Sequence, residues 1–500
     1  MHTGIPDALI AAEVDMPGWL LALDRHLDRH FPVLLEWLRP ERHRLIDNAP
    51  CSLGSPHDAP ACGHEWMRRA TTPSTLAGHD FRVLIGSAAS CRQPYRASVF
   101  NLHASSADTL SADAILALGG AARRSGFAHG TGEGPISAQH RVHGGDLIWQ
   151  IGPGHVGCRD ELGRFDPVRF AEQATEPQVR MIEITLGPDR WPDPGGGAFG
   201  HPVELMLFIE RLRRLSGGKP VGIRWCTGHP LAWFSLVKAM RHTHMTPDFI
   251  VVDGLQDDNG TTPLDQAGPA GLRLVHDTLV GTGLRERIRI GCITPVASAF
   301  DIARVMALGA DWCSSARGFM FALGCIQVQD CHAGACPTGV ARRDGHAPRA
   351  RVMPDKIERV ERFHRYTLEA LKELLQAAGL SHPDEIRPAH IQRHVGRHAV
   401  GSLADRLIDV PPGAVLAAER GEGPWPDAVF ARDWPRARAD SFSPALPPSR
   451  QASLGAEHPV AGVAQARHDV AVLVELPVDG RGVDRHVGVV GVEVREALGC

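Results

Sequence analysis

The feature that most constrains this chain is an alternation between short apolar runs and amphipathic segments of helical period, which begins near residue 98. Such alternation is typical of parallel α/β folds, because each crossover between parallel strands needs a helix. We predict strands at 98–102, 127–130, 147–151, 179–186, 220–225, 248–253, 288–293 and 311–314. Helices are expected between them, for example at 111–124, 202–215, 231–242 and 299–308. Strands in this number predict a closed (β/α)8 barrel, whose active site is built from the loops that follow the strands.

Length and composition fit one such barrel with flanking segments. The chain has 500 residues, and a barrel of this kind needs about 250. Hydrophobic residues make up 43% and charged residues 22%, which is ordinary for a globular enzyme. The net charge of −4, without a basic run, argues against nucleic acid as a main partner. We find neither an apolar run near the ~20 residues of a membrane helix nor a signal peptide, and therefore expect a cytoplasmic protein without a membrane partner.

We divide the chain into four segments by composition and period. Residues 1–80 are interpreted as an N-terminal extension of helices and loops, and 81–345 as the barrel with a cysteine-rich loop. Residues 346–402 form a C-terminal helical segment, in which 355–380 have strong helical periodicity. Residues 403–500 are rich in Pro, Gly and Ser at first and lack a clear period at the end. We interpret this last segment as a linker-rich, poorly ordered tail.

Three cysteines lie within twelve residues, at Cys325, Cys331 and Cys336, and a proline follows the last of them. Thiolates at such spacing can converge on one soft metal centre, and the proline stiffens the turn after the last ligand. Three ligands without an adjacent fourth favour a three-iron cluster. A Cys3His zinc site that uses His332 is the competing interpretation, although His332 directly follows Cys331 and adjacent side chains rarely converge on one ion. Three buried, inert cysteines are the remaining alternative.

The cysteine-rich stretch, Phe319 to Ala341, resembles the cluster loop of the FMN-binding domain of glutamate synthases. More closely, it resembles stand-alone FMN-binding glutamate synthase family proteins, with a similarity that runs with gaps from about residue 81 to about residue 402. The other matching segments are 91–101, 126–134, 144–149, 248–254 and 310–320. This resemblance implies a (β/α)8 barrel that holds FMN and a [3Fe-4S] cluster. It also implies reduction of 2-iminoglutarate, formed from 2-oxoglutarate and ammonia, to L-glutamate.

The resemblance assigns catalytic roles to two residues. Glu133 corresponds to the family's Glu, which helps to hold the imino end of the substrate, and its carboxylate suits a cationic group. Arg224 stands where the family has a Lys near the N1–C2=O edge of the flavin, where a cation stabilises the reduced ring. From the residues alone, a Glu in a glycine-rich loop such as Glu133 is more often simply a solvated side chain. A surface arginine at a strand end is the less favoured alternative for Arg224.

The resemblance also assigns the cofactor contacts. The FMN ring is expected beside the loop of Ser105 and Ser106, and Cys325, Cys331 and Cys336 are the implied ligands of the cluster. The FMN phosphate is expected at the loop of the last strand, whose backbone N–H groups open a short helix. The residues of this loop are Ser315, Ala316, Arg317 and Gly318.

Several positions depart from the family pattern. Thr185 replaces a Lys that grips the oxo-acid, the family's following Gln is absent, and Thr294 and Pro295 replace a Gly and a Lys at the phosphate. We therefore expect weakened FMN binding and keep two functions open. The first is a glutamate synthase-type oxidoreductase that acts on a small-molecule substrate and receives electrons from a separate donor protein. The second is a non-enzymatic, cluster-bearing scaffold or partner-binding relative.

Overall fold

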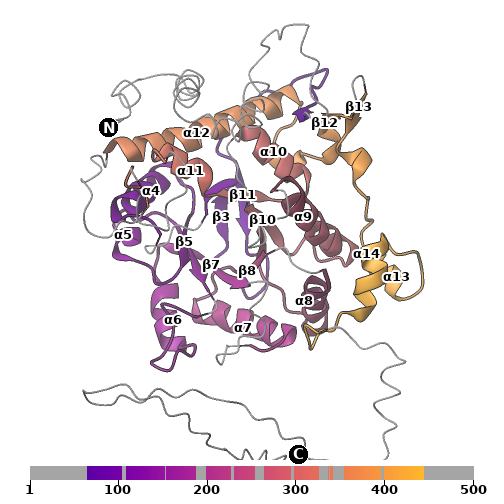
Figure 1. Ribbon diagram of the computed structural model, residues 1–500, viewed down its shortest axis with the longest axis horizontal. Coiled ribbons are helices and arrows are strands. Elements are labelled where there is room, and N and C mark those ends of the chain that lie inside the picture. The colour runs from indigo at the N-terminus through magenta and orange to yellow at the C-terminus, as the bar shows by residue number, and fades with distance from the viewer. Residues whose placement is uncertain are drawn as a thin grey trace, which may run out of the picture. The chain divides into compact units, whose positions relative to one another are not determined.

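The protein is described here by a computed structural model. It describes residues 65–103, 109–152, 154–186, 199–226, 230–253, 264–293, 298–325, 336, 338–341, 354–395 and 399–443. Parallel strands close into a barrel in the order β10-β11-β4-β5-β6-β7-β8-β9 (Figure 1). The strands are β4 (Phe100–Leu102), β5 (His129–Glu133), β6 (Leu147–Ile151), β7 (Val179–Leu186), β8 (Val221–Cys226), β9 (Phe249–Asp253), β10 (Arg289–Ile293) and β11 (Trp312–Ser315). The predicted (β/α)8 fold is confirmed.

Helices connect successive strands and surround the barrel. They are α4 (Ala112–Ser125), α5 (Ala138–Arg141), α6 (Pro167–Ala174), α7 (Pro202–Leu215), α8 (Pro230–Thr243), α9 (Leu264–Gly281), α10 (Ala299–Ala307) and α11 (Arg317–Ala322). Capping residues in the sequence determine where two of these helices begin. The Ser111 side chain accepts the Ala114 N–H at the start of α4, and Ser298 and Asp301 form a capping box at the start of α10.

A hairpin closes the N-terminal end of the barrel. It consists of β2 (Arg82–Ile85) and β3 (Tyr95–Ser98), which pair antiparallel. Ile85 and Tyr95 of the hairpin join an apolar cluster with Phe249 of β9 and Trp312 of β11. The latter two point into the barrel, because they alternate with outward-facing residues on their strands. Ser87 Oγ donates to the carbonyl of Arg287, just before β10, and so fixes the hairpin at this end. The opposite end, where the strands finish, is the end at which barrel enzymes bind their ligands.

Two glycines inside the barrel make room for these aromatic rings. A Cβ atom on Gly222 would lie 2.4 Å from the ring of Phe249, and one on Gly291 would lie 2.4 Å from the ring of Trp312. Side chains cannot approach so closely, so each ring occupies the space of the missing side chain. The N-terminal half of the barrel interior is thereby packed with apolar groups.

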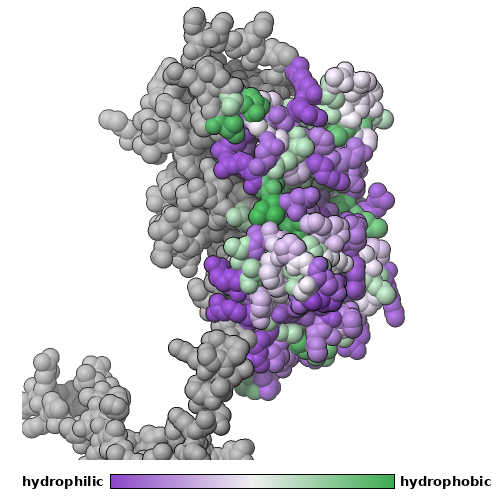
Figure 2. Space-filling model, turned by 90° about the vertical axis from the view of Figure 1, so that its right-hand side faces the viewer, coloured by the Kyte–Doolittle hydropathy of each residue, from purple (hydrophilic) through white to green (hydrophobic). Residues whose placement is uncertain are grey.

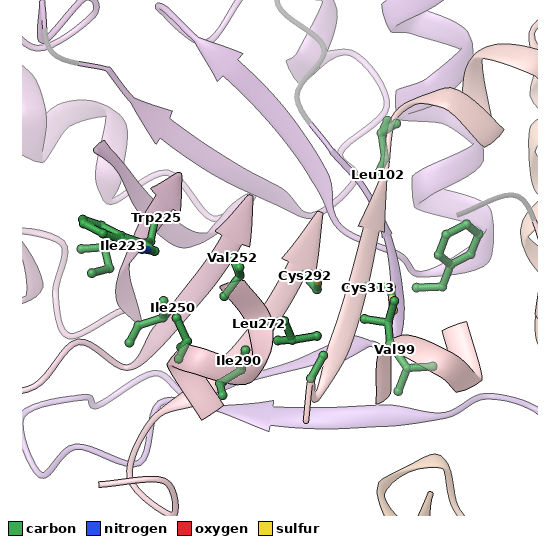
Figure 3. Close-up of a cluster of buried hydrophobic side chains, with 14 of the residues drawn as sticks. Val99, Leu102, Ile223, Trp225, Ile250, Val252, Leu272, Ile290, Cys292 and Cys313 are labelled. Carbon is green, nitrogen blue, oxygen red and sulfur yellow. The ribbon is translucent and has the colours of Figure 1, made fainter. Parts of the chain in front are cut away.

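The outward-facing residues of the strands pack beneath the helices. Figure 3 shows this layer on neighbouring strands, with Leu272 of α9 among the strand residues. Alternate residues of β8, β9 and β10, among them Ile223, Ile250 and Ile290, are fully buried in it. Since one face of each strand packs here, the other face of the same strand points into the barrel.

Helix α12 (Pro354–Ala377) packs on α4, α10 and α11. It matches the helix predicted at 355–380, and its His364 Nε2 lies 3.0 Å from the carbonyl oxygen of Phe100. A small sheet follows, in which β1 (Glu65–Met67) and β13 (Val400–Ser402) flank β12 (Ile391–His394). The described part of the expected N-terminal extension therefore contributes a strand, while residues 1–64 lie outside the described residues.

The segment expected to be a linker-rich tail contains helices in its described part. They are α13 (Ala414–Glu419), α14 (Ala428–Asp433) and η5 (Trp434–Arg436). Phe430 and Trp434 are buried and pack against Phe234 of α8, with ring centroids 5.1 and 5.4 Å away. Residues 403–443 thus include short helices, and aromatic side chains anchor part of them to the barrel, whereas residues 444–500 lie outside the described part.

Polar residues cover most of the described surface that Figure 2 shows, and hydrophobic residues form small areas between them. Within the described ranges, no helix is both long enough and apolar enough to cross a membrane.

Candidate active site

Polar side chains occupy inward-facing positions on five neighbouring strands, above the apolar half of the barrel interior. In strand order they are Glu133 of β5, Gln150 of β6, Glu183 of β7, Arg224 of β8 and Asp253 of β9. Each lies in the second half of its strand, toward the C-terminal mouth of the barrel. Such a layer is costly unless its members pair with one another, so their contacts define the site.

Arg224 is the centre of this layer. Its Nε donates to Asp253 Oδ2 at 2.8 Å, and its Nη2 donates to the same oxygen. Its Nη1 lies 3.8 Å from Glu133 Oε1. Burial alone would lower the pKa of Arg224, but the charges of Asp253 and Glu183 outweigh it and raise the pKa above its usual range. The guanidinium is therefore firmly charged and largely neutralised by its own neighbours.

The structure thus brings together the two residues predicted to be catalytic. Glu133 remains about half exposed at the mouth, whereas Asp253 is fully buried beneath Arg224. Arg224 is 12% exposed, so the interpretation as a surface arginine is wrong. The buried carboxylate of Asp253 accepts hydrogen bonds from two of the three guanidinium nitrogens of Arg224. The third nitrogen, Nη1, therefore faces Glu133 and the mouth.

Glu183 is the buried titratable group of the site. Its Oε1 accepts a hydrogen bond of 2.6 Å from Gln150 Nε2. Burial raises the pKa of Glu183 to about 7, although Arg224 and the bond from Gln150 lower it in part. Its carboxyl group therefore changes charge near neutral pH, directly below the mouth.

Two further buried side chains lie close to Arg224. Thr185 pairs in register with it on the adjacent strand, is 8% exposed, and its Oγ1 has no hydrogen-bond partner among the described residues. His103 follows β4, and burial together with the charge of Arg224 holds its pKa well below the usual range. A buried hydroxyl without a partner is costly, so Thr185 marks a place where a ligand atom is expected.

The predicted phosphate loop lies at the end of β11. The backbone N–H of Gly318 donates to Ser315 Oγ at 3.3 Å, and the carbonyl of Ser315 accepts the His103 N–H at 3.0 Å. Ala316 and Arg317 are half-buried at the start of α11. Ser105, Ser106, Thr294 and Pro295 lie outside the described residues, so the assignments of ring and phosphate contacts stay predictions.

Cys336 sits in a turn that favours a thiolate. Burial would raise its pKa, but hydrogen bonds from the Thr338 hydroxyl and from the backbone N–H groups of Ala341, Thr338 and Val340 outweigh burial and lower it. Ser111 holds this turn, because its N–H donates to the carbonyl of Val340 and its Oγ to that of Gly339. The turn is thereby fixed beside the loop that joins β4 to α4.

Cys325 lies just beyond α11, where its N–H donates to the carbonyl of Met320. Cys331 and His332 lie outside the described residues. Within the described ranges, no three His, Cys, Asp or Glu side chains gather closely enough to hold a metal ion. Neither the iron–sulfur nor the zinc interpretation is therefore tested by the geometry.

Gln150, Glu183, Asp253 and His103 were not predicted as site residues. The sequence did contain a signal for the first three, because each is a polar residue that directly follows a buried apolar residue in its strand. Combined with the two-residue alternation of a strand, that pattern predicts polar groups inside the barrel. Nothing in the sequence indicated that His103 would be buried against the neighbouring loop.

Residues 198–381 match the conserved region in glutamate synthase. The chain is 33% identical over 314 residues to a glutamate synthase large subunit-like protein of Bacillus subtilis, and this match covers 56% of the chain and 59% of that protein. It is 26% identical over 317 residues to an archaeal-type glutamate synthase [NADPH] of Thermotoga maritima, a match that covers 58% of the chain and 61% of that protein. Over these residues the chain is similar to proteins of the glutamate synthase family.

The matched glutamate synthase region contains Arg224, Asp253 and both described cysteines of the loop, while Glu133 and Glu183 precede it. The chain spans about three fifths of the length of the curated relatives it matches. Among solved structures, a mandelate oxidase is similar with a TM-score of 0.41 and 14% identity, and the match covers 65% of this chain and 85% of that one.

Proposed function

We propose that this protein is an FMN-dependent oxidoreductase of the glutamate synthase type. It would form L-glutamate by reducing 2-iminoglutarate, which arises from 2-oxoglutarate and ammonia. The observation that carries the proposal is the group of Glu133, Arg224 and Asp253 at the mouth of a glutamate synthase family barrel. Curated relatives such as the Thermotoga maritima protein are named as glutamate synthases, which supports the same reaction.

The described residues at the mouth fit a flavin, but they offer it little net positive charge. FMN, when bound, would accept two electrons and pass them to the substrate carbon. Thr185 Oγ1, which has no hydrogen-bond partner among the described residues, offers a hydrogen bond, and the loop of Ser315 to Gly318 would receive the phosphate. Asp253, however, already neutralises Arg224 and leaves less positive charge for an anionic ring. This arrangement, together with Thr294 and Pro295 in the phosphate loop, supports binding that is weak but not lost.

The protein's own residues have distinct tasks in this proposal. The carboxylate of Glu133 would hold the cationic imino end of the substrate, because it is half exposed at the mouth. Arg224 would orient Glu133 and present its Nη1 side to an anionic group. Asp253 would keep the guanidinium in place, as a buried carboxylate that accepts two of its hydrogen bonds.

FMN binding tests this proposal directly. FMN is titrated against the cofactor-free protein, and quenching of flavin fluorescence is followed up to nearly millimolar FMN. Each lost phosphate contact costs on the order of 1–3 kcal/mol, so two lost contacts weaken affinity by a factor of about 100. The double variant Thr294→Gly with Pro295→Lys should therefore tighten binding. Pro411→Lys, which adds the same charge at an exposed position outside the barrel, is the control.

Absence of quenching in every variant would refute the oxidoreductase. That result would favour the second function, a cluster-bearing scaffold, for which the neutralisation of Arg224 by Asp253 is the supporting observation.

We also propose that Cys325, Cys331 and Cys336 bind one [3Fe-4S] cluster, which would exchange electrons with a separate donor protein. The lowered pKa of Cys336 supports this assignment, because metal ligands bind as thiolates. The protein is purified without oxygen, and iron, sulfide and zinc are measured. Cys336→Ser should remove iron and sulfide together, whereas Cys91→Ser, a half-buried cysteine in the hairpin, should remove neither. Zinc found without sulfide would refute the cluster and support the Cys3His zinc site instead.

A further inference from the structure

The turn that carries Glu133 is not held by regular strand pairing. The register between β5 and β6 shifts between Gly130 and Glu133, and Gly132 has a φ of 73°, so the ladder is interrupted just before the catalytic carboxylate. An interruption of this kind leaves backbone groups that need other partners. In this barrel, those partners come from one residue of the neighbouring strand.

That residue is Gln150, which is fully buried. Its side-chain Oε1 accepts the Gly132 N–H at 2.8 Å, and its backbone N–H donates to Thr131 Oγ1 at 3.2 Å. On the other side, its Nε2 donates to Glu183 Oε1 at 2.6 Å. Both side-chain contacts require the same orientation of the amide, because Gly132 offers a donor and Glu183 an acceptor.

We propose that Gln150 and Glu183 form a positioning pair, in which Glu183 fixes the amide of Gln150 and Gln150 holds the turn that keeps Glu133 beside Arg224. Neither residue needs to touch the substrate. This inference rests on the proposed function for the role of Glu133, but the mechanical link from Glu183 to the turn does not depend on any cofactor.

The pair gives the site a dependence on pH. Glu183 faces the charges of Arg224 on the adjacent strand and of Asp253 and Glu133 one strand further away on either side, in addition to the uncharged Gln150. When Glu183 is ionised, its bond from Gln150 is charge-assisted and holds the amide more firmly than the protonated acid does. Since the pKa of Glu183 is about 7, the turn should be held better at pH 8 than at pH 6.

Hydrogen exchange of the cofactor-free protein tests the link. The peptide that spans residues 128–136 is followed by mass spectrometry in the wild type, Gln150→Leu and Glu183→Gln. We expect Gln150→Leu to speed its exchange by about tenfold, as for the loss of an opening free energy of about 1.4 kcal/mol. At pH 6, where Glu183 is mostly protonated, Glu183→Gln should leave exchange near the wild-type rate, because its amide oxygen still accepts from Gln150. Gln178→Leu, at the residue just before β7, is the control for general loosening.

The proposal is overturned if Gln150→Leu exchanges like the wild type, or if Gln178→Leu speeds the same peptide equally. After correction for intrinsic exchange, protection in the wild type should rise from pH 6 to pH 8, whereas Glu183→Gln should give a flat profile. Equal pH profiles in the two proteins would overturn the role of Glu183.

A second measurement connects the pair to the substrate. In FMN-loaded protein with 2-oxoglutarate and ammonium chloride as the probe, Gln150→Leu should raise the KM for ammonium by about tenfold, and Gln178→Leu should leave it unchanged. An unchanged KM in Gln150→Leu would show that the turn does not position Glu133 for the substrate. If the loaded wild type shows no turnover at all, the proposed function fails, while the exchange experiment still decides whether the positioning pair exists.

Discussion

Replacing Glu183 with Gln removes a carboxyl group whose charged form the barrel interior disfavours. Its pKa rises from the ordinary value of 4.5 to about 7, chiefly because of burial. Below about pH 4.5, the group is protonated in both the folded and the unfolded chain and does not change the stability of the folded state. As the pH rises from there to about 7, the unfolded chain ionises first, so the folded state loses stability. Above pH 7 the loss stays constant at roughly 3 kcal/mol, since each pKa unit corresponds to about 1.4 kcal/mol.

The Glu183→Gln protein should therefore be more stable than the wild type at high pH, and the advantage should grow by about 2 kcal/mol between pH 5.5 and pH 8.5. Urea denaturation at the two pH values measures it. With an m-value of about 3–4 kcal/mol per M, the difference between the two midpoints should change by roughly 0.5 M. Glu172→Gln, on the exposed face of α6, is the control and should show no such change. A pH-independent difference, or a Glu183→Gln protein that is less stable at pH 8.5, would refute the reasoning.

Three more substitutions test the energetics of the fold. Arg224→Met should destabilise the protein by about 3–5 kcal/mol in urea, because it leaves Asp253 buried without its cation; a loss below about 1 kcal/mol would show that the ion pair contributes little to stability. Trp434→Ala should lower the free energy of unfolding by about 3–5 kcal/mol and make the chain after residue 403 sensitive to limited proteolysis. Unchanged resistance to the protease would contradict the observed packing of Trp434 on α8. Gly222→Ala should lower the melting temperature or prevent folding, because its Cβ would lie 2.4 Å from the ring of Phe249, and a wild-type melting temperature would show that the barrel interior relaxes freely.

The barrel strands could be predicted closely because their periodicity and length are local properties. The strands predicted at 147–151 and 179–186 agree with β6 and β7 residue for residue. The helices after residue 403 could not be predicted in the same way. The two α-helices are only six residues long and lie between Pro- and Gly-rich turns, so they depend on packing rather than on local propensity. α13 packs on α9, whereas Phe430 and Trp434 pack on α8.

The candidate catalytic residues Glu133 and Arg224 were predicted from the resemblance alone. Their roles stay predictions, and the structure places the two side chains beside each other. The role of Asp253 depends on hydrogen bonds from Arg224 of the neighbouring strand, which no local pattern encodes. The pKa of Glu183 likewise depends on burial and on the surrounding charges, which exist only once the barrel is closed.

The central claim is that this barrel carries flavin chemistry on an imino acid. Its most direct test is the reoxidation of reduced flavin in a single turnover. FMN-loaded protein is reduced by light without oxygen and mixed with 2-oxoglutarate and ammonium chloride, while the flavin absorbance is followed. The account predicts rapid reoxidation that needs both compounds and yields one L-glutamate per flavin. Flavin that stays reduced, or that is reoxidised equally by 2-oxoglutarate without ammonium, would contradict it.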